Sequence, residues 1–293
     1  MVEHRQSSDG DSALPLHARL PINRCNLPPQ ILGSLTFQQH PVPLQIDGVM
    51  ALHGHFFEQL DEIQSAGLRA KVFQEFMRAS FFLDHPEEAG LQRGKQRLHR
   101  EHADYQCMLR GWMFDADGQE AAVLKSWVES RFGLLPRSHH GPLGDFSGPN
   151  YQLYLAARST GLYNTNALEA QLDLLYTYCQ YELARRFPAR SHIRLYRGLN
   201  RIDDHERLAQ NSPSSWIMLL NNLNSFSGDA ERADEFGDLV ITSQIPLSKI
   251  LYMPGLFPRS LRGEQEYLVI GGVYLVERHN PFSVHATNSD KSL

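Results

Sequence analysis

Two glutamates separated by a single residue are the strongest candidates for chemistry in this sequence. Glu264 and Glu266 lead directly into the apolar residues 267–270, a pattern that predicts a strand. Because side chains alternate between the two faces of a strand, both carboxylates share one face, about 7 Å apart. Leu268 and Ile270 continue that face, so we expect it to point toward the core.

Two carboxylates at the edge of a buried face call for a cationic partner. Like charges repel each other, and burial disfavours the charged form of each carboxylate. A substrate cation or a cationic transition state would offset both effects. The alternative is an ordinary exposed strand, on which Glu-x-Glu is common.

Two further segments strengthen the chemical interpretation. Tyr196-Arg197-Gly198 ends a predicted strand, with an arginine that could hold a phosphate and a glycine that lets backbone approach a ligand. Ser225-Phe226-Ser227 ends another strand and places two hydroxyls beside an aromatic ring. Each segment alone could be a surface arginine, a serine turn or a buried phenylalanine. Their order, followed by Glu-x-Glu, indicates a single site built on strands.

Other catalytic patterns are absent from the sequence. It contains no Gly-x-Gly-x-x-Gly, no phosphate-binding Gly-x-x-x-x-Gly-Lys and no Gly-x-Ser-x-Gly nucleophile motif. Its close histidine pairs lack metal-ligand spacing, and we expect no metal in the catalytic step. The 28 Lys+Arg against 33 Asp+Glu give a net charge of -5, which disfavours nucleic-acid binding.

The elements that must position these residues change in type along the chain. Apolar residues at helical spacing predict helices over about 52–67, 72–81, 92–112, 118–131 and 166–186, with a loop at 134–149. Short strands are predicted at 193–198, 215–221, 223–227, 239–244, 249–252, 264–270 and 273–277, with a helix at 229–236. Helices followed by strands indicate an α+β fold with a mostly antiparallel sheet, not a doubly wound one.

The same patterns divide the 293 residues into four parts. We expect residues 1–44 to form an extended, partly disordered arm, 45–190 a helical region, 191–279 the β-rich catalytic region and 280–293 a tail. Three cysteines are too few for a disulfide framework and favour a reducing compartment. No apolar run is long enough for a membrane span and no signal peptide is evident, so we expect a cytoplasmic protein.

The order of the three motifs resembles the arginine–serine–glutamate class of mono-ADP-ribosyltransferases, and its Glu-x-Glu form resembles the arginine-modifying subtype. The segments 193–200 (IRLYRGLN) and 263–272 (GEQEYLVIGG), with the helical first half, are similar to the bacterial enzymes that modify dinitrogenase reductase, over nearly the whole chain. This resemblance implies a helical N-terminal half packed on an NAD-binding antiparallel β-sandwich, with NAD+ as co-substrate.

The resemblance also implies roles for the residues that would bind NAD. Arg197 would hold the pyrophosphate or the adjacent ribose, and backbone groups of Gly198 would clamp the nicotinamide amide. Ser225 would support the pocket and the catalytic glutamate, while Phe226 or Phe236 would pack against the nicotinamide. The class often has Ser-Thr-Ser at this position, whereas this chain has Ser-Phe-Ser. Either Ser225 or Ser227 could therefore fill the serine role, and we favour Ser225.

Further roles implied by the resemblance concern catalysis and the acceptor. Glu266 would be the catalytic glutamate, bonded to the 2′-OH of the nicotinamide ribose. Glu264 would engage the target arginine. Residues 254–263 would form the target-recognition turn, with Phe257 as its aromatic contact.

Three functions remain open from the sequence. The first is ADP-ribosylation of dinitrogenase reductase, which would reversibly inactivate nitrogen fixation. The second is the same chemistry on another protein or on a small guanidino acceptor. The third is a non-catalytic NAD-binding regulatory module. The resemblance further implies regulation by a PII-type nitrogen-signalling protein, although no residue pattern here indicates that contact.

Overall fold

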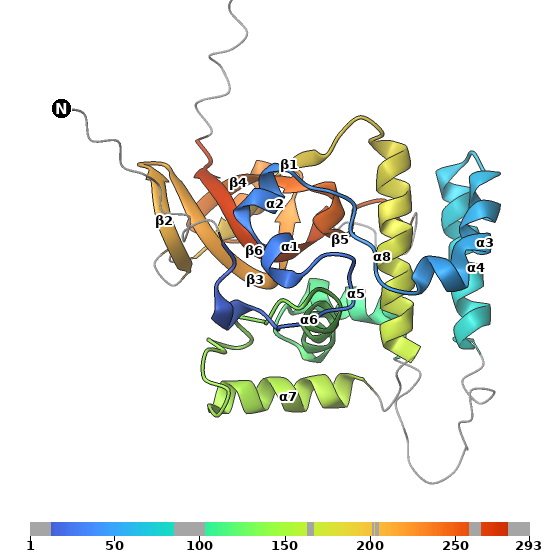
Figure 1. The fold of residues 1–293 in the computed structure, drawn as a ribbon, viewed down its shortest axis with the longest axis horizontal. Coiled ribbons are helices and arrows are strands. Elements are labelled where there is room, and N and C mark those ends of the chain that lie inside the picture. Colours follow the sequence, from blue (N-terminus) through green and yellow to red (C-terminus); the bar gives the residue numbers. More distant parts are fainter. Residues whose placement is uncertain are drawn as a thin grey trace, which may run out of the picture.

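A computed structural model describes residues 13–84, 103–162, 167–200, 202, 205–257 and 265–280. Helices occupy the first part of the described chain and strands the second (Figure 1). The helices are α1 Pro29–Leu32, α2 Leu35–Gln39, α3 Val49–Asp61, α4 Ala66–Phe81, α5 Tyr105–Phe114, α6 Gln119–Phe132, α7 Pro149–Gly161 and α8 Ala167–Arg186, preceded by the 3-10 turn η1 Leu16–Ala18. The predicted α+β class is confirmed.

The second part of the chain forms an antiparallel sheet. Its strands are β1 His192–Leu199, β2 Glu206–Ser212, β3 Ser215–Ser227, β4 Leu239–Pro246, β5 Ile250–Tyr252 and β6 Glu266–Arg278, with the short helix α9 Ala230–Asp234 and the 3-10 turn η4 Leu247–Lys249. Their order is β2-β3-β1-β4-β6-β5, with an additional β3–β6 pairing. Strands β1, β3, β6 and β4 thus close a ring of antiparallel pairings. Their buried side chains belong to one hydrophobic core that the helices share.

Several predicted boundaries were wrong. Two predicted strands merge into each of β3 and β6, and the structure adds β2 and α7, which the sequence did not suggest. The paired glycines Gly271 and Gly272 look like a strand end but lie inside β6, opposite a bulge in β3. A Cβ on Gly271 would lie 1.7 Å from the Asn221 carbonyl oxygen, so the close approach of the two backbones requires glycine there.

The N-terminal arm is less extended than expected. It contains α1 and α2, and α2 lies against β4 and β6. The buried side chain of Gln38 donates to the Ser243 hydroxyl at 2.9 Å and accepts the Leu275 N–H at 2.7 Å. This amide therefore fastens the arm to β4 and β6. Residues 1–12 and 281–293 lie outside the described part, as does the first part of the helix predicted at 92–112.

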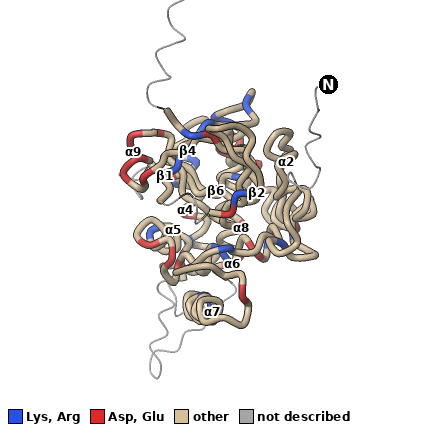
Figure 2. The backbone as a smooth tube through the Cα atoms, turned by 90° about the vertical axis from the view of Figure 1, so that its left-hand side faces the viewer, with Lys and Arg blue, Asp and Glu red and all other residues tan. Residues whose placement is uncertain are grey.

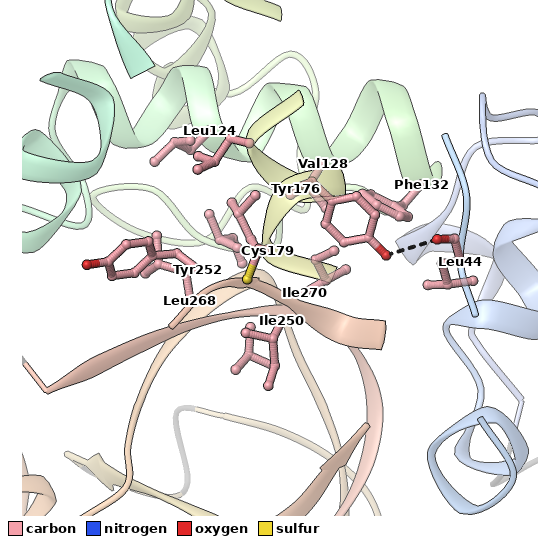
Figure 3. Close-up of a cluster of buried hydrophobic side chains, with 14 of the residues drawn as sticks. Leu44, Leu124, Val128, Phe132, Tyr176, Cys179, Ile250, Tyr252, Leu268 and Ile270 are labelled. Atoms are coloured by element: carbon pink, nitrogen blue, oxygen red, sulfur yellow. Dashed lines mark hydrogen bonds between the residues drawn. The ribbon is translucent and has the colours of Figure 1, made fainter. Parts of the chain in front are cut away.

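A helical layer covers one face of the sheet. Helix α8 lies between the strands and the α3–α4 pair (Figure 1). In Figure 3, Tyr176 and Cys179 of α8 meet Ile250, Leu268 and Ile270 of the sheet, beneath side chains of α6. Leu268 and Ile270 are fully buried, which confirms that their strand face points inward.

Helix α4 is joined to α8 by a buried ion pair. The Arg69 guanidinium donates to both carboxylate oxygens of Glu182, at 2.6 and 3.0 Å, and both side chains are buried. Arg69 also donates to the carbonyls of Ile63 and Gln64, which follow α3. One arginine therefore fixes the α3–α4 turn against α8. Among the helices that the structure describes, none is long and apolar enough to cross a membrane.

A buried lysine makes the stability of the fold depend on pH. Lys249 is 2% exposed, donates to the Gly271 carbonyl at 2.7 Å and lies near the rings of Phe37 and Tyr274. Burial lowers the pKa of Lys249 to about 7, well below that of an exposed lysine. Between these two pKa values the unfolded chain binds the extra proton, so stability rises with pH.

We predict that Lys249→Met removes this rise. The unfolding free energy of the wild type, relative to Lys249→Met, should grow by up to about 1.4 kcal/mol per pH unit between about pH 7 and 10. Urea denaturation of both proteins at several pH values measures the difference. A difference that stays constant over this range would contradict the buried, neutral lysine.

Candidate active site

The arginine, serine and glutamate motifs meet at one place in the structure. Ser227 at the end of β3 pairs with Tyr196 on β1 and with Glu266 at the start of β6. This register brings the ends of three strands together. Arg197 follows Tyr196 on β1, and Ser225 lies two residues before Ser227 on β3.

Hydrogen bonds join the members of this group. The Arg197 Nη1 donates to the backbone carbonyl of Ser225 at 2.7 Å, and the Ser225 hydroxyl donates to Glu266 Oε1. Burial lowers the pKa of Arg197, and the negative charge of Glu266 opposes that shift. Ser225 therefore links the arginine motif to the glutamate motif.

A tryptophan from the helical half completes the network. The indole Nε1–H of Trp112, in the last turn of α5, donates to Ser225 Oγ at 2.9 Å and to Glu266 Oε1 at 3.0 Å. Trp112 is 3% exposed. It was not anticipated as a site residue, because helical periodicity marks it only as a core position.

The network borders a cavity of about 330 Å³. Both halves of the chain line it: Trp112, Met113, Phe114 and Ala116 come from the helical half, and Tyr196, Arg197, Gly198, Ser225, Phe226, Ser227, Arg232, Ala233, Phe236, Gln265 and Glu266 from the β-rich half. It therefore combines a carboxylate, a guanidinium and several aromatic rings. These groups suit a ligand that carries both charge and a flat ring.

A second cavity of about 700 Å³ adjoins the first. The two share Trp112, Ala116, Arg197 and Ser225 as lining residues. Lys125 also lines the second cavity, and its ammonium pairs with Asp117 at 2.8 Å. Burial lowers the pKa of Lys125, an effect that the Asp117 carboxylate opposes. Arg197 therefore lies at the junction of the two cavities.

Comparison with known proteins agrees with this arrangement. Residues 22–278 match the family model described as dinitrogenase reductase ADP-ribosyltransferase. The chain belongs to this family. It is 38% identical over 258 residues to the NAD(+)–dinitrogen-reductase ADP-D-ribosyltransferase of Rhodospirillum rubrum, covering 87% of this chain and 93% of that protein. No solved structure gave a significant match.

The family's two serine positions have different contacts here. Ser225 donates to Glu266, whereas the Ser227 hydroxyl accepts the Asp229 N–H at 3.0 Å, in the turn before α9. Ser225 is thus the serine that bonds the glutamate, and Ser227 supports the turn that leads into α9.

The two candidate phenylalanines both line the cavity but differ in exposure. Phe226 is buried, with the Arg197 guanidinium 6.0 Å from its ring centroid. Phe236 follows α9 and is 62% exposed at the cavity edge. Of the two, Phe236 offers the accessible ring in this structure.

Phe257 does not lie where we predicted. We expected its ring to face an acceptor, but it is 2% exposed and stacks with Phe73 and Tyr178 in the core. A large aromatic side chain is stabilised by such burial, and this ring therefore holds the helical half against the sheet. Residues 258–263 of the expected recognition turn lie outside the described residues, and so does Glu264.

No group of three or more His, Cys, Asp or Glu side chains suited to a metal ion occurs within the described ranges. The cysteines Cys25, Cys107 and Cys179 are free thiols.

Gly198 shows how closely α9 approaches β1. A Cβ on Gly198 would lie 2.3 Å from the Ala233 carbonyl oxygen and 2.9 Å from backbone atoms of Phe236 and Gly237. No flexible side chain could move aside, because all three contacts are with backbone. Glycine at this position therefore lets α9 form the cavity wall.

We predict that Gly198→Ala displaces α9 and lowers the unfolding free energy by about 1–3 kcal/mol, as overpacking does. Gly228→Ala is the matched control, because its Cβ would meet only the Tyr267 ring, at 3.6 Å. Denaturant unfolding of both variants measures the effect. Equal stabilities for the two variants would contradict the tight α9–β1 contact.

Proposed function

We propose that this protein transfers ADP-ribose from NAD+ to an arginine side chain of dinitrogenase reductase. The observation that carries the proposal is the hydrogen-bonded group of Glu266 and Ser225, with Arg197, on the wall of one cavity. Membership of the family supports the transfer reaction, and the name of the Rhodospirillum rubrum relative supports both substrates.

Glu266 suits the bond-breaking step. Cleavage of the bond between nicotinamide and ribose develops positive charge on the ribose as an oxocarbenium ion. A fixed carboxylate stabilises this charge more than it stabilises the neutral ribose of the ground state. Nicotinamide leaves as a neutral molecule, so it requires no general acid.

Glu264 suits the transfer step. An arginine guanidinium is protonated and is therefore a poor nucleophile. A second carboxylate beside the catalytic one could orient it and accept its proton as the new bond to ribose forms. The Glu-x-Glu sequence and the position of Gln265, which lines the cavity, support this role.

The paired cavities suit the elongated NAD molecule. The nicotinamide ribose would lie in the smaller cavity beside Glu266, with nicotinamide near Gly198 and Phe236. Arg197, at the junction, would hold the pyrophosphate, and the rest of the dinucleotide would extend into the larger cavity.

The cavity edge suits a basic acceptor. Phe114 is 94% exposed and Phe236 is 62% exposed, and both line the smaller cavity. Acidic residues gather on the neighbouring helix α9 (Figure 2). Aromatic rings and acidic groups both attract a guanidinium. Because the Arg232 guanidinium already lies 5.5 Å from the centroid of the Phe236 ring, the exposed Phe114 ring and the acidic groups are better candidates for contact with an acceptor arginine than Phe257.

The cellular setting rests on the family resemblance. A cytoplasmic location, reversible inactivation of nitrogen fixation and regulation by a PII-type protein all form part of the proposal. The free cysteines are compatible with a reducing compartment.

The direct test is Glu266→Gln. The variant keeps the size of the side chain but removes the charge, so transfer should fall by at least about 10²–10³-fold while the fold and much of the NAD affinity persist. Release of nicotinamide, and label from NAD on purified dinitrogenase reductase, are measured for variant and wild type. Wild-type-like transfer by the variant would refute the assignment.

Glu264→Gln is the companion variant in this experiment. Because its proposed role is in arginine attack, it should lose transfer to a larger extent than slow NAD hydrolysis. Equal loss of the two activities would argue against that role.

A further inference from the structure

Trp112 reaches the site from a part of the chain with no catalytic motif. It lies in α5, a helix that packs on α6 and α8. Its single N–H is directed to Ser225 Oγ and Glu266 Oε1, residues 113 and 154 positions away in the sequence. The same side chain lines both cavities.

We propose that Trp112 is a positioning residue that holds the Glu266 carboxylate in its reactive orientation, so that the helical half completes the active site. This inference rests on the proposed ADP-ribosyltransferase function. It assigns to α5 a role in the reaction, exerted through Glu266, in addition to its role in packing.

Two donors on one carboxylate oxygen restrict how the side chain can turn. Trp112 and Ser225 both donate to Oε1 of Glu266. Hydrogen bonds to a charged acceptor are stronger than those between neutral groups, and they favour the ionised carboxylate. The pair thus fixes the direction of the carboxylate that would face the oxocarbenium ion.

Trp112 is buried beside a cation that is itself hydrogen-bonded. The ammonium of Lys125 lies 5.8 Å from the centroid of its ring. That ammonium is tied to Asp117 at 2.8 Å and to the Ser138 carbonyl at 3.0 Å. A buried donor with such a neighbour is preorganised, and preorganised donors are the ones that contribute effectively to electrostatic stabilisation.

Trp127 shows what a purely structural tryptophan looks like in this protein. It is 1% exposed on α6, and its indole N–H donates to Asp173 at 2.7 Å. It lines neither of the two cavities described above. The two tryptophans therefore match in burial and in donating to a carboxylate, but only Trp112 donates to the catalytic group.

The experiment compares Trp112→Phe with Trp127→Phe in the full chain. For Trp112→Phe we expect kcat for nicotinamide release to fall roughly 10- to 100-fold, the loss typical of one hydrogen bond to a charged group. KM for NAD+ should change little, and the acidic limb of the pH–rate profile should move to higher pH. Trp127→Phe should lower the melting temperature and keep the wild-type kcat and pH profile.

Three results would overturn the inference. One is a wild-type kcat and pH profile for Trp112→Phe. Another is a loss of kcat in both variants that follows their melting temperatures, since that indicates a structural role alone. The third is a wild-type protein that cleaves no NAD+ with any acceptor, which overturns the proposed function as well. Hydrolysis without transfer to dinitrogenase reductase refutes only the acceptor, because hydrolysis still reports on Glu266.

A spectroscopic measurement covers the case in which Trp112→Phe does not fold. The chain has three tryptophans, so the indole N–H region of a nitrogen-15 spectrum is simple. In Glu266→Gln the Trp112 N–H signal should move, because its charged acceptor is lost, while the Trp127 signal stays in place. An unmoved Trp112 signal would refute the contact.

Discussion

The packing of the helical layer against one face of β6 is the interaction on which the rest of the structure depends. Leu268 and Ile270 are completely buried against α8 and α6 (Figure 3). Burial of each such side chain contributes about 1.5–3 kcal/mol. Because side chains alternate along a strand, Glu266 lies on the same face of β6 as Leu268 and Ile270. The packing that stabilises the fold therefore also brings the Glu266 carboxylate to the helices. The meeting of Glu266 with Trp112 follows from this single face.

Ser225 holds a positive and a negative side chain, Arg197 and Glu266, close to each other at the site. Arg197 is anchored by the Ser225 carbonyl, and Glu266 is bonded by the Ser225 hydroxyl. In the proposed reaction the two charges have separate roles. The guanidinium holds the pyrophosphate, and the carboxylate faces the charge that develops on ribose. A group that serves the transition state in this way raises the rate rather than only the affinity.

The spacing of apolar residues in the sequence predicted those features that depend on neighbouring residues alone. The change from helical to strand periodicity gave the α+β class, and strand alternation gave the inward face of Leu268 and Ile270. The order of Arg197, Ser225 and Glu266 suggested a shared site, which the register of β1, β3 and β6 assembles.

Long-range contacts were not predictable in the same way. Helical spacing marks Trp112 as buried, but it carries no information about a partner 154 positions later. Phe257 was assigned to a recognition turn because the family resemblance implied it, yet its ring stacks in the core.

The most direct test of the central claim is to incubate the protein with labelled NAD+ and purified dinitrogenase reductase, and to map the modified residue by mass spectrometry. The account predicts one ADP-ribose on an arginine side chain, with nicotinamide released in equal amount. Label on a residue other than arginine, or nicotinamide release without any label on the acceptor, would contradict it.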